Sequence, residues 1–426
     1  MNKIIFHIDG DAFFASCEQS TRLDLRGRAI AVGRERGVAT AFSYEAKAMG
    51  ITRGMSATEI ARDFPSVLFI SSDYRKYGLF STRMNCITRK YTELIEQTSI
   101  DECYADMSAV VVDTEKAKEI ALKLQNELSV KLGLTFSIGI GPNKTIAKIA
   151  SSMNKPRGIT LLFPDTFETN LYNLSIDKVS GIGPQSAIKF HTKNIYTIGQ
   201  FVGCNAVWVY EHFAKPFVEL HRELRGHFIR ELELLPTIPK SISKIRAFSP
   251  ATSSQDILYS EFVRNAEIVA SKLSHLKLEA KLVVFSMKCV DGTRSKQEVR
   301  AEYPITSSSD IVVHLKHIFN QLYDKDKQYR STSVAVYKLG PFGAQQSLFT
   351  NSRSERYTRE RIGDLLAGLT NRFGKGAVSS ASSMVAQART IPTSGRNSTP
   401  TSQRGTPLIT NKENGRALYL PYLGRI

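Results

Sequence analysis

Residues 4–14 read IIFHIDGDAFF, a short apolar run that leads directly into two aspartates. A continuous apolar run of this length is typical of a strand buried on both faces. A carboxylate at the end of such a strand, facing a cleft, is well placed to hold a hard cation. The stretch therefore predicts a buried strand that leads into a cation site, with Asp9 as the candidate ligand.

A second acidic pair, Asp101 and Glu102, stands directly before an apolar stretch at 103–107 that we expect to be a strand. Adjacent acids this close to an apolar strand cost free energy unless a positive charge offsets them. If Asp9, Asp101 and Glu102 converge, they form an oxygen-rich site for two Mg²⁺ ions, which can activate an attacking hydroxyl and stabilise a leaving phosphate. The alternative is that each pair caps a helix or lies in a solvated turn.

Around these acids the sequence alternates irregularly between strand and helix patterns, which favours a mixed sheet covered by helices. We expect strands at 4–8, 29–32, 67–70, 103–107 and 135–140, and helices at 43–49, 56–63, 75–97 and 114–132. Short helices are expected from about 165 to 235, with a Gly-x-Gly turn at Gly181–Gly183. Such a turn can point backbone N–H groups at a phosphate.

The two prolines of residues 235–240 indicate a linker, after which the pattern returns to α+β. We expect helices at 260–276, 310–322 and 356–373, and strands at 281–290 and 332–339. Residues 378–415 are rich in Ser, Thr, Gly, Asn and Pro, and we predict that they are disordered. The final apolar residues, LYLPYL, are either a docking peptide or a strand packed on its own protein.

The composition excludes several classes of protein. Of the 426 residues, 42% are hydrophobic and 23% are charged, which is ordinary for a globular protein. No apolar run approaches the roughly 20 residues that a membrane helix needs, and the N-terminus lacks the pattern of a secretory signal. The five cysteines form no CxxC pair, which argues against disulfides or zinc. We therefore expect a cytoplasmic protein that does not span a membrane.

The net charge of +17 lies almost entirely in the second half of the chain. Residues 1–235 hold 29 Lys and Arg against 26 Asp and Glu, whereas residues 236–426 hold 28 against 14. The excess indicates either a polyanionic partner or a solvated basic surface.

Several cationic and aromatic residues are candidates for binding phosphate or a partner. Lys144, Lys148 and Lys155 suit triphosphate oxygens as point charges. Tyr44 and Lys47, near an expected helix start, could also reach phosphates. The stretch QQSLF at 345–349 resembles an anchor peptide for a hydrophobic pocket.

Taken together, the order and spacing of these stretches resemble the Y-family DNA polymerases, the translesion class, from about residue 3 to 349. Within the family the likeness is to bacterial DNA polymerase IV, with some features of the polymerase V catalytic subunit. The stretches are HIDGDAFFASCE, SYEAKAMGITRGM, SSDYRKY, SIDECYAD, GLTFSIGIGPNKTIAKIASSMNKPRGIT, VSGIGPQSA, PKSISKIRAF and QQSLF.

The resemblance implies an α+β multidomain, right-hand fold. Its parts are a palm at 1–165 with fingers inserted at about 20–75, a helix-hairpin-helix thumb at 166–235, a linker at 236–242, a little finger at 243–342, a clamp-binding peptide at 343–350 and a partly disordered extension at 351–426.

The resemblance also implies residue roles. Asp9, the Gly10 carbonyl, Asp101 and Glu102 match the ligands of two Mg²⁺ ions, with Mn²⁺ as an alternative. Phe13 and Phe14 are expected nucleotide contacts, and Phe14 matches the steric gate against a ribonucleotide. The expected triphosphate contacts are Tyr44, Lys47 and Lys155, with either Thr40 or Ser43 supplying a hydroxyl. The expected DNA contacts are Gly181, Ile182, Gly183, Lys240, Lys244 and Arg246, and the expected clamp contacts are Gln345, Leu348 and Phe349.

The implied activity is template-directed, low-fidelity addition of dNTPs to a primer 3′-OH in translesion synthesis and DNA repair, as part of an SOS response. Primed DNA, dNTPs and a sliding clamp would be partners at the nucleoid, with an accessory subunit and recombinase if the protein is polymerase V-like. Two alternatives stay open: a relative that binds DNA and clamp but has weak catalysis, and a palm-type nucleotidyl cyclase.

Overall fold

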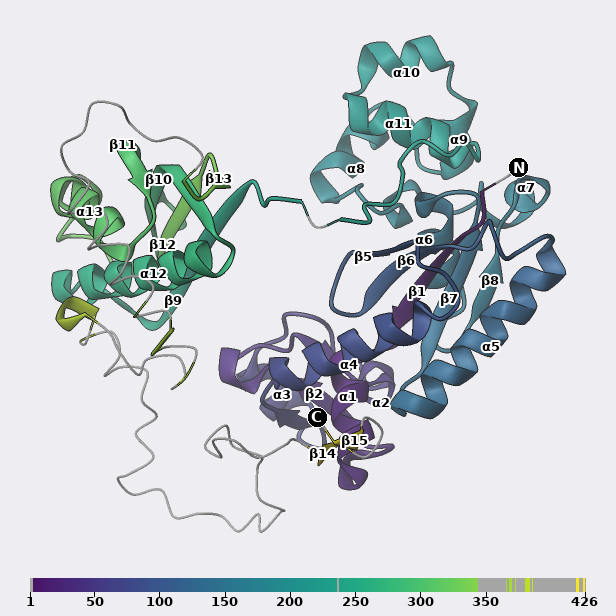
Figure 1. The fold of residues 1–426 in the computed structure, drawn as a ribbon, viewed down its shortest axis with the longest axis horizontal. Coiled ribbons are helices and arrows are strands. Elements are labelled where there is room, and N and C mark those ends of the chain that lie inside the picture. Colours follow the sequence, from purple (N-terminus) through teal and green to yellow (C-terminus); the bar gives the residue numbers. More distant parts are fainter. Residues whose placement is uncertain are drawn as a thin grey trace. The chain divides into compact units, whose positions relative to one another are not determined.

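The computed structural model describes residues 3–235 and 237–343, with shorter pieces at 365, 368–369, 372, 380–383, 385, 419–420 and 424–425. The chain divides into two compact units, one made of Met1–Pro236 and Pro407–Ile426 and one made of Thr237–Thr406. The boundary falls in the proline-containing stretch that the sequence marks as a linker. Figure 1 shows the elements of each unit.

A five-stranded mixed sheet organises the first unit, in the order β5-β6-β1-β7-β8. The central strand β1 (Ile5–Gly10) is buried along its whole length and pairs antiparallel with both of its neighbours. Its neighbours are β6 (Glu102–Asp106) and β7 (Phe136–Gly141), and the outer strands are β5 (Ile95–Gln97) and β8 (Ile159–Leu161). Glu102 of the second acidic pair therefore lies on the strand beside the one that carries Asp9.

The alternation of side chains along β1 divides the sheet into two faces. Phe6 and Ile8 pack into the main core with α4 (Tyr74–Thr88) and α5 (Thr114–Leu132). His7 faces the other way, where α6 (Lys144–Met153) crosses the sheet. The close crossing needs Gly139 on β7, because a side chain there would collide with the backbone of α6. Asp9 shares the face of His7, since it lies two residues further along the strand.

A small insert follows α1 (Phe13–Thr21) and forms its own three-stranded sheet, in the order β3-β2-β4. Its strands are β2 (Ile30–Val32), β3 (Ala41–Phe42) and β4 (Leu68–Ile70), and its helices are α2 (Tyr44–Ala48) and α3 (Ala57–Asp63). Ser56 and Glu59 form a capping box that starts α3. The insert has a separate small apolar core.

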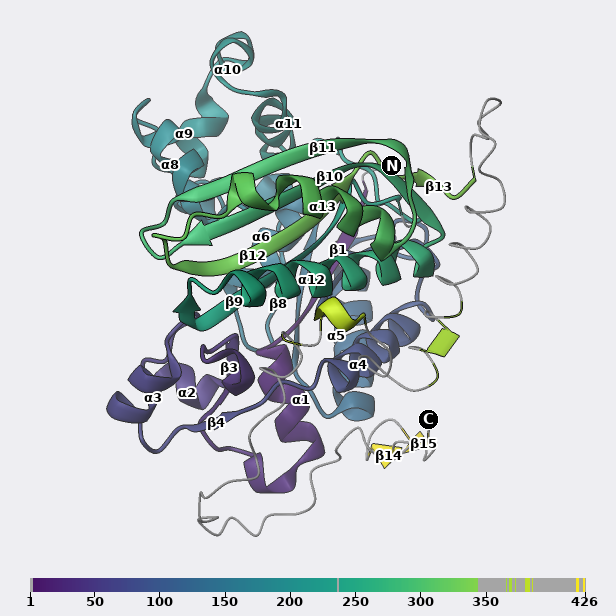
Figure 2. The same cartoon turned by 90° about the vertical axis from the view of Figure 1, so that its left-hand side faces the viewer.

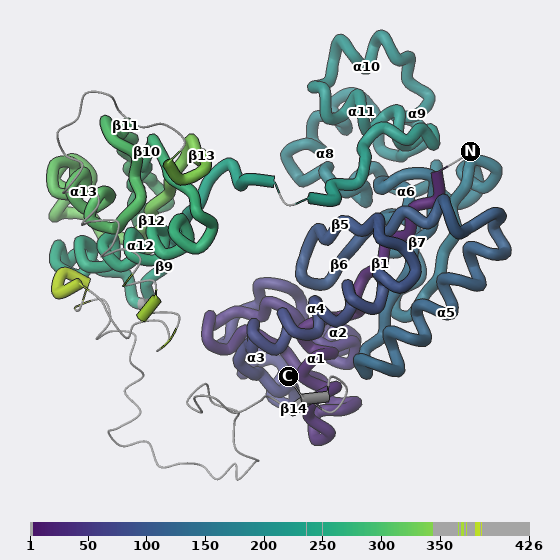
Figure 3. The backbone as a smooth tube through the Cα atoms, viewed as in Figure 1, coloured from purple at the N-terminus to yellow at the C-terminus, as the bar shows by residue number. Residues whose placement is uncertain are grey.

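Short helices follow β8 and share a third apolar core with one face of α6. They are α7 (Phe167–Asn170), α8 (Pro184–His191), α9 (Ile198–Gly203), α10 (Ala206–His212) and α11 (Lys215–Leu224). After α11 the chain runs back to the large sheet, where Phe228 and Leu232 pack against Ile5 and Tyr104. Figure 3 traces this path.

The second unit is a four-stranded antiparallel sheet in the order β11-β10-β12-β9, with two helices across it (Figure 2). The strands are β9 (Ser241–Thr252), β10 (Leu278–Cys289), β11 (Arg294–Ile305) and β12 (Tyr329–Tyr337), the helices are α12 (Gln255–His275) and α13 (Ser308–Leu322), and a short β13 (Gly340–Pro341) pairs with β10. Phe262, Phe285 and Phe319 lie in its core, so both helices cover one face.

The structure corrects several expectations. The helix expected at 75–97 ends at Thr88, because residues 95–97 pair with β6 as strand β5. Strand β1 continues through Asp9 and Gly10 instead of ending before them. The long strands β9 and β11 were missed, since their many polar residues do not form an apolar run.

Part of the tail also differs from the prediction of disorder. Residues 381–383 form a 3₁₀ turn beside α12, where the Ser380 hydroxyl donates to Glu267 at 2.6 Å. Tyr419–Leu420 pair antiparallel with Gly424–Arg425, so part of the apolar end is a short strand. The clamp peptide Gln345–Phe349 and most of the helix expected at 356–373 lie outside the described residues.

Candidate active site

Strand pairing brings the two acidic motifs together. Asp9 on β1 stands directly opposite Glu102 on β6. The Gly10 amide donates to the Asp101 carbonyl at 2.9 Å, which holds the second acid next to the first motif. The convergence expected from the sequence is therefore a consequence of register between neighbouring strands.

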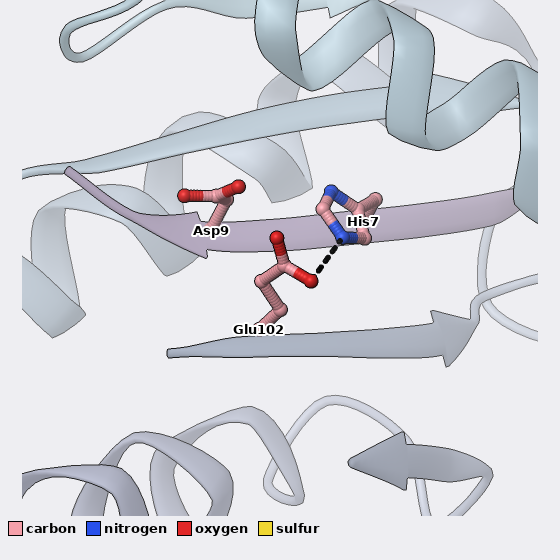
Figure 4. A group of neighbouring side chains, drawn as sticks. All are labelled: His7, Asp9 and Glu102. Atoms are coloured by element: carbon pink, nitrogen blue, oxygen red, sulfur yellow. Dashed lines mark ion pairs between the residues drawn. The ribbon is translucent and has the colours of Figure 1, made fainter. Parts of the chain in front are cut away.

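A histidine that the sequence analysis did not single out completes this cluster. His7, Asp9 and Glu102 each offer one ligand atom, and these atoms lie within 4.8 Å of one another (Figure 4). His7 Nε2 is 3.9 Å from Glu102 Oε2, and Nδ1 is 2.7 Å from the Ser151 hydroxyl. Burial lowers the pKa of His7. The signal in the sequence is the spacing of two from Asp9, which places both side chains on one face.

Two lysines already neutralise these carboxylates. Lys155 Nζ lies 2.5 Å from Asp9 Oδ1, and Lys148 Nζ lies 2.6 Å from Glu102 Oε2. Burial raises the pKa of Asp9 to about 7 against the opposing effect of Lys155. The His7 ring and the Lys148 ammonium hold the pKa of Glu102 at about 2. The two acids thus differ strongly in their affinity for a proton.

The second aspartate of the first motif has a different task. Asp11 is fully buried and accepts hydrogen bonds from the Ser137 hydroxyl at 2.7 Å and the Arg157 amide at 2.8 Å. Arg157 has a φ of 60° and follows a cis Lys155–Pro156 bond. Asp11 therefore fixes the loop that carries Lys155 to Asp9.

Asp101 lies beside the cluster with a partner of its own. The Ser99 hydroxyl donates to Asp101 Oδ1 at 2.5 Å. Its negative charge is one of the effects that raise the pKa of Asp9, so the two carboxylates are close enough to interact.

The donor set fits a hard divalent cation. The acids supply carboxylate oxygens, which Mg²⁺ and Mn²⁺ prefer, and a backbone carbonyl is available at Gly10. Two ammonium groups occupy positions on these same carboxylates. These carboxylates therefore attract positively charged groups.

A stack of aromatic rings forms between α1, which directly follows the first acidic motif, and α4. Phe14 is half-buried and stacks on Tyr77, with ring centroids 4.4 Å apart and planes at 13°. Tyr74 meets Phe14 edge-on at 5.6 Å. Phe13, by contrast, lies in the core, and its ring limits the space beside Gly10.

Two residues that are expected to contact the triphosphate, Tyr44 and Lys47, lie on the short helix α2 of the insert. Lys47 is exposed and lies 5.6 Å from the centroid of the Tyr44 ring. Burial, followed by the charges of Asp11 and Asp9, raises the pKa of Tyr44 to about 12, so this phenol faces the acidic motif.

The two hydroxyls left open by the sequence both have partners in the protein. Ser43 is buried and caps α2. Thr40 donates to the Val32 carbonyl at 3.0 Å and is less buried than Ser43. Thr40 is therefore the more accessible of the two.

The Gly-x-Gly turn lies before α8 as expected. Gly181 has a φ of 96°, a conformation that favours glycine, and open space lies beside it and beside Gly183. Ile182 between them is buried and anchors the turn in the helical core. The backbone of this turn is thus presented to solvent on a fixed base.

The basic residues of the second unit lie on two different faces of its sheet. Lys240 is exposed before β9, and Lys244 and Arg246 pair with Val334 and Thr332 on the face that the helices cover. The open face carries a row that sequence reasoning missed. Its basic residues are Lys288 on β10 and Arg294, Lys296 and Arg300 on β11. Glu298 lies in the same row and pairs with Lys296. The alternation of charged residues along 294–300, three of them basic, is the signal that could have revealed this row.

Comparison with known proteins agrees with this architecture. The model of the impB/mucB/samB family matches residues 8–152, and that of its C-terminal domain matches 239–348. A DNA polymerase IV of Lactococcus lactis subsp. cremoris is 32% identical over 343 residues, which cover 79% of this chain and 94% of that protein. A DNA polymerase IV of Streptococcus pyogenes serotype M12 is 30% identical over 341 residues, 79% and 93% of the two chains. The chain belongs to the Y-family of DNA polymerases.

Solved structures support the same fold. The Y-family DNA polymerase chimera Dbh-Dpo4(243-245)-Dbh matches with a TM-score of 0.70 at 21% identity, over 79% of this chain and 99% of that chain. An insertion ternary complex of Dbh DNA polymerase matches with a TM-score of 0.52, also at 21% identity, over 78% and 98%. The right-hand fold expected from the sequence is confirmed, and the enzyme class is a DNA-directed DNA polymerase of the translesion type. Among the described residues, no helix is long and apolar enough to cross a bilayer.

Proposed function

We propose that this Y-family polymerase extends a primer 3′-OH with dNTPs by two-metal-ion chemistry at Asp9, Asp101 and Glu102. The observation that carries the proposal is the strand register that sets Asp9 opposite Glu102 and ties Gly10 to Asp101. Two bound Mg²⁺ ions, or Mn²⁺ in their place, would supply activation of the attacking hydroxyl and stabilisation of the leaving pyrophosphate.

Different residues of this chain would bind the cations and the triphosphate. Glu102, with its pKa of about 2, is ionised at neutral pH and is ready to bind a cation. A cation held at Asp9 would favour the carboxylate over the protonated form and would compete with Lys155 for it. Lys155, together with Lys47 and Tyr44, would supply contacts to the triphosphate. Catalysis consists of positioning and charge stabilisation.

Phe14 is proposed as the gate against ribonucleotides, since its ring is half-buried, held by a stack and carried by the helix that directly follows the first acidic motif. The extra 2′-hydroxyl of a ribonucleotide would clash with this ring. Phe14→Ala should therefore admit ribonucleotides, and unchanged sugar selection would refute the role of the gate.

We assign the grip on duplex DNA to backbone phosphates, independent of sequence. The turn Gly181–Gly183 offers backbone N–H groups, and the open-face row offers Lys288, Arg294, Lys296 and Arg300. Lys240, Lys244 and Arg246 remain proposed contacts at the entry to the second unit. Binding of this kind weakens steeply with salt.

The sliding clamp is proposed as a partner through Gln345, Leu348 and Phe349. Deletion of residues 345–349 should reduce primer extension only when the clamp is loaded on the DNA. An equal loss without the clamp would mean that the segment is structural. A pull-down with clamp and recombinase would test for the accessory partners of a polymerase V-like enzyme.

Primer extension on a primed template with Mg²⁺ and dNTPs is the test of the metal site. The wild type should extend the primer, and Asp101→Ala should abolish extension. Extension that survives this change would refute the ligand assignment. No extension by the wild type would instead favour a binding factor with weak catalysis.

A further inference from the structure

Glu18 is a buried acid that the proposed chemistry leaves without a task. Only 4% of the residue is exposed. It lies on α1 four residues after Phe14, so both side chains lie on the same face of that helix. A carboxylate out of contact with water is costly unless it is paired and hydrogen-bonded. The partners of Glu18 therefore indicate which part of the structure the buried carboxylate holds in place.

Both carboxylate oxygens of Glu18 are bound to the first turn of α4. Oε2 accepts from Lys76 Nζ at 2.7 Å, and Oε1 accepts from the Tyr77 hydroxyl at 2.7 Å. Hydrogen bonds to an ionised acceptor are shorter and stronger than neutral ones. The lysine supplies the compensating charge, and the tyrosine is held at the far end of its ring.

The Tyr77 ring links the carboxylate of Glu18 to Phe14, because its hydroxyl binds Glu18 and its face contacts Phe14. It is fully buried, and it is the ring on which Phe14 stacks at 4.4 Å and 13°. Tyr74 meets both rings edge-on, Tyr77 at 5.8 Å and Phe14 at 5.6 Å, and so borders the stacked pair. Because the hydroxyl is fixed by Glu18, the Tyr77 ring cannot tilt without breaking a charged hydrogen bond. The plane of Phe14 follows the plane of Tyr77.

We propose that Glu18 is a positioning residue for sugar selection, which acts through the Tyr77 hydroxyl to hold Phe14 at the 2′ position of the incoming nucleotide. The inference rests on the proposed role of Phe14 as the gate. A steric gate discriminates by a fraction of an ångström, so small freedom in its support reduces selectivity more than it reduces use of the correct substrate.

Tyr77→Phe is the sharpest test, because it keeps the stacked ring and removes only the hydroxyl. The measurement is kcat/KM for a dNTP and for the matching rNTP on the same primed template. We expect the ratio of the two values to fall about tenfold, which corresponds to about 1.4 kcal/mol of differential transition-state binding. Most of the change should appear as a lower KM for the rNTP.

Two further variants separate positioning from general loosening. Glu18→Gln keeps an oxygen that can accept from Tyr77 and should relax selection less than Tyr77→Phe. Tyr91→Phe is the matched control, since its hydroxyl donates to Glu127 at 2.8 Å elsewhere in the same unit. The control should leave the ratio unchanged.

The outcomes distinguish the positioning role of Glu18 from the gate role of Phe14 on which it rests. If Phe14→Ala does not raise rNTP use, the gate itself is misassigned. If Phe14→Ala admits rNTPs while Tyr77→Phe keeps the wild-type ratio, the positioning role of Glu18 is overturned. If Tyr77→Phe does not fold, the ratio for Glu18→Gln decides, and an unchanged ratio there overturns the role.

Discussion

Removal of the Arg230 side chain should loosen the segment that returns from the helices to the large sheet. Glu223 is fully buried, and its carboxylate forms an ion pair with the Arg230 guanidinium, whose Nε lies 2.9 Å from Oε2. The Thr145 hydroxyl donates to the same oxygen at 2.6 Å, and the Arg230 amide donates to Oε1 at 3.2 Å. Arg230→Met leaves these two hydrogen bonds in place and removes the compensating charge.

Breaking a buried ion pair on one side costs about 3–5 kcal/mol, because an uncompensated charge stays inside. The Arg230 side chain is 47% exposed, which screens the pair, and two hydrogen bonds to Glu223 survive. Both effects place Arg230→Met at the lower end, at about 3 kcal/mol or less. For a unit of this size, that loss corresponds to a fall of roughly 6–12 °C in the unfolding temperature. Scanning calorimetry of the full chain would measure the transition of the first unit.

A double variant tests whether charge is the cause. Glu223→Leu combined with Arg230→Met removes both charges, and replacement of a buried pair by apolar groups is often nearly neutral. The double variant should therefore be more stable than Arg230→Met alone. A shift below 1 °C for the single variant, or a double variant that is no better, would refute the reasoning.

Three other changes test separate parts of the first unit. Lys148→Met should raise the pKa of Glu102 and tighten binding of Mn²⁺ about three- to tenfold, because a competing ammonium is removed. Electron paramagnetic resonance titration measures this binding, and weaker binding than in the wild type would contradict the prediction. Gly139→Ala should destabilise the unit by about 1–3 kcal/mol in a denaturant titration, because the new methyl meets the backbone of α6, whereas Gly78→Ala, with open space beside it, should be neutral or stabilising. Glu127→Gln should lower the unfolding temperature at pH 7, because Lys131, Lys90 and Tyr91 hold the pKa of Glu127 at about 2. That pKa is below the unfolded value of 4.5, so the difference should shrink as the pH falls below about 4.5, and an equal difference at pH 3 would contradict the assignment.

The sequence was most informative where one local pattern determines the structure. The strand at Ile5–Gly10 and the helix at Thr114–Leu132 follow from an apolar run and from regular amphipathic spacing. The strand at 95–97 could not be found in this way, because its identity depends on pairing with β6 rather than on its own period. Strand β11 escaped notice for a related reason, since its residues are polar on the open face and only half-buried on the other.

The candidate site shows the same division between local and distant information. Asp9 and Glu102 could be predicted as a pair from two motifs. Acids at the start or end of buried strands cost free energy unless a positive charge, such as a shared cation, offsets them. The partners that tune them come from a helix and a loop far along the chain: Lys148 lies 46 residues after Glu102, and Lys155 lies 146 residues after Asp9 (155 minus 9). No spacing rule joins these lysines to the acids.

The two aspartates of the first motif show how the fold assigns roles to identical side chains. Asp9 and Asp11 are two residues apart, yet Asp11 accepts hydrogen bonds from a hydroxyl and an amide, and Asp9 faces the ammonium of Lys155. The difference arises because the strand ends between them, at Gly10, and Ala12 then turns the chain with a φ of 46°. Asp11 holds the loop of Lys155, and Lys155 holds Asp9, so the motif supports its own ligand. A change at Asp11 should therefore displace Lys155 from Asp9, and with it the charge proposed for the triphosphate, even though Asp11 is outside the cluster around Asp9.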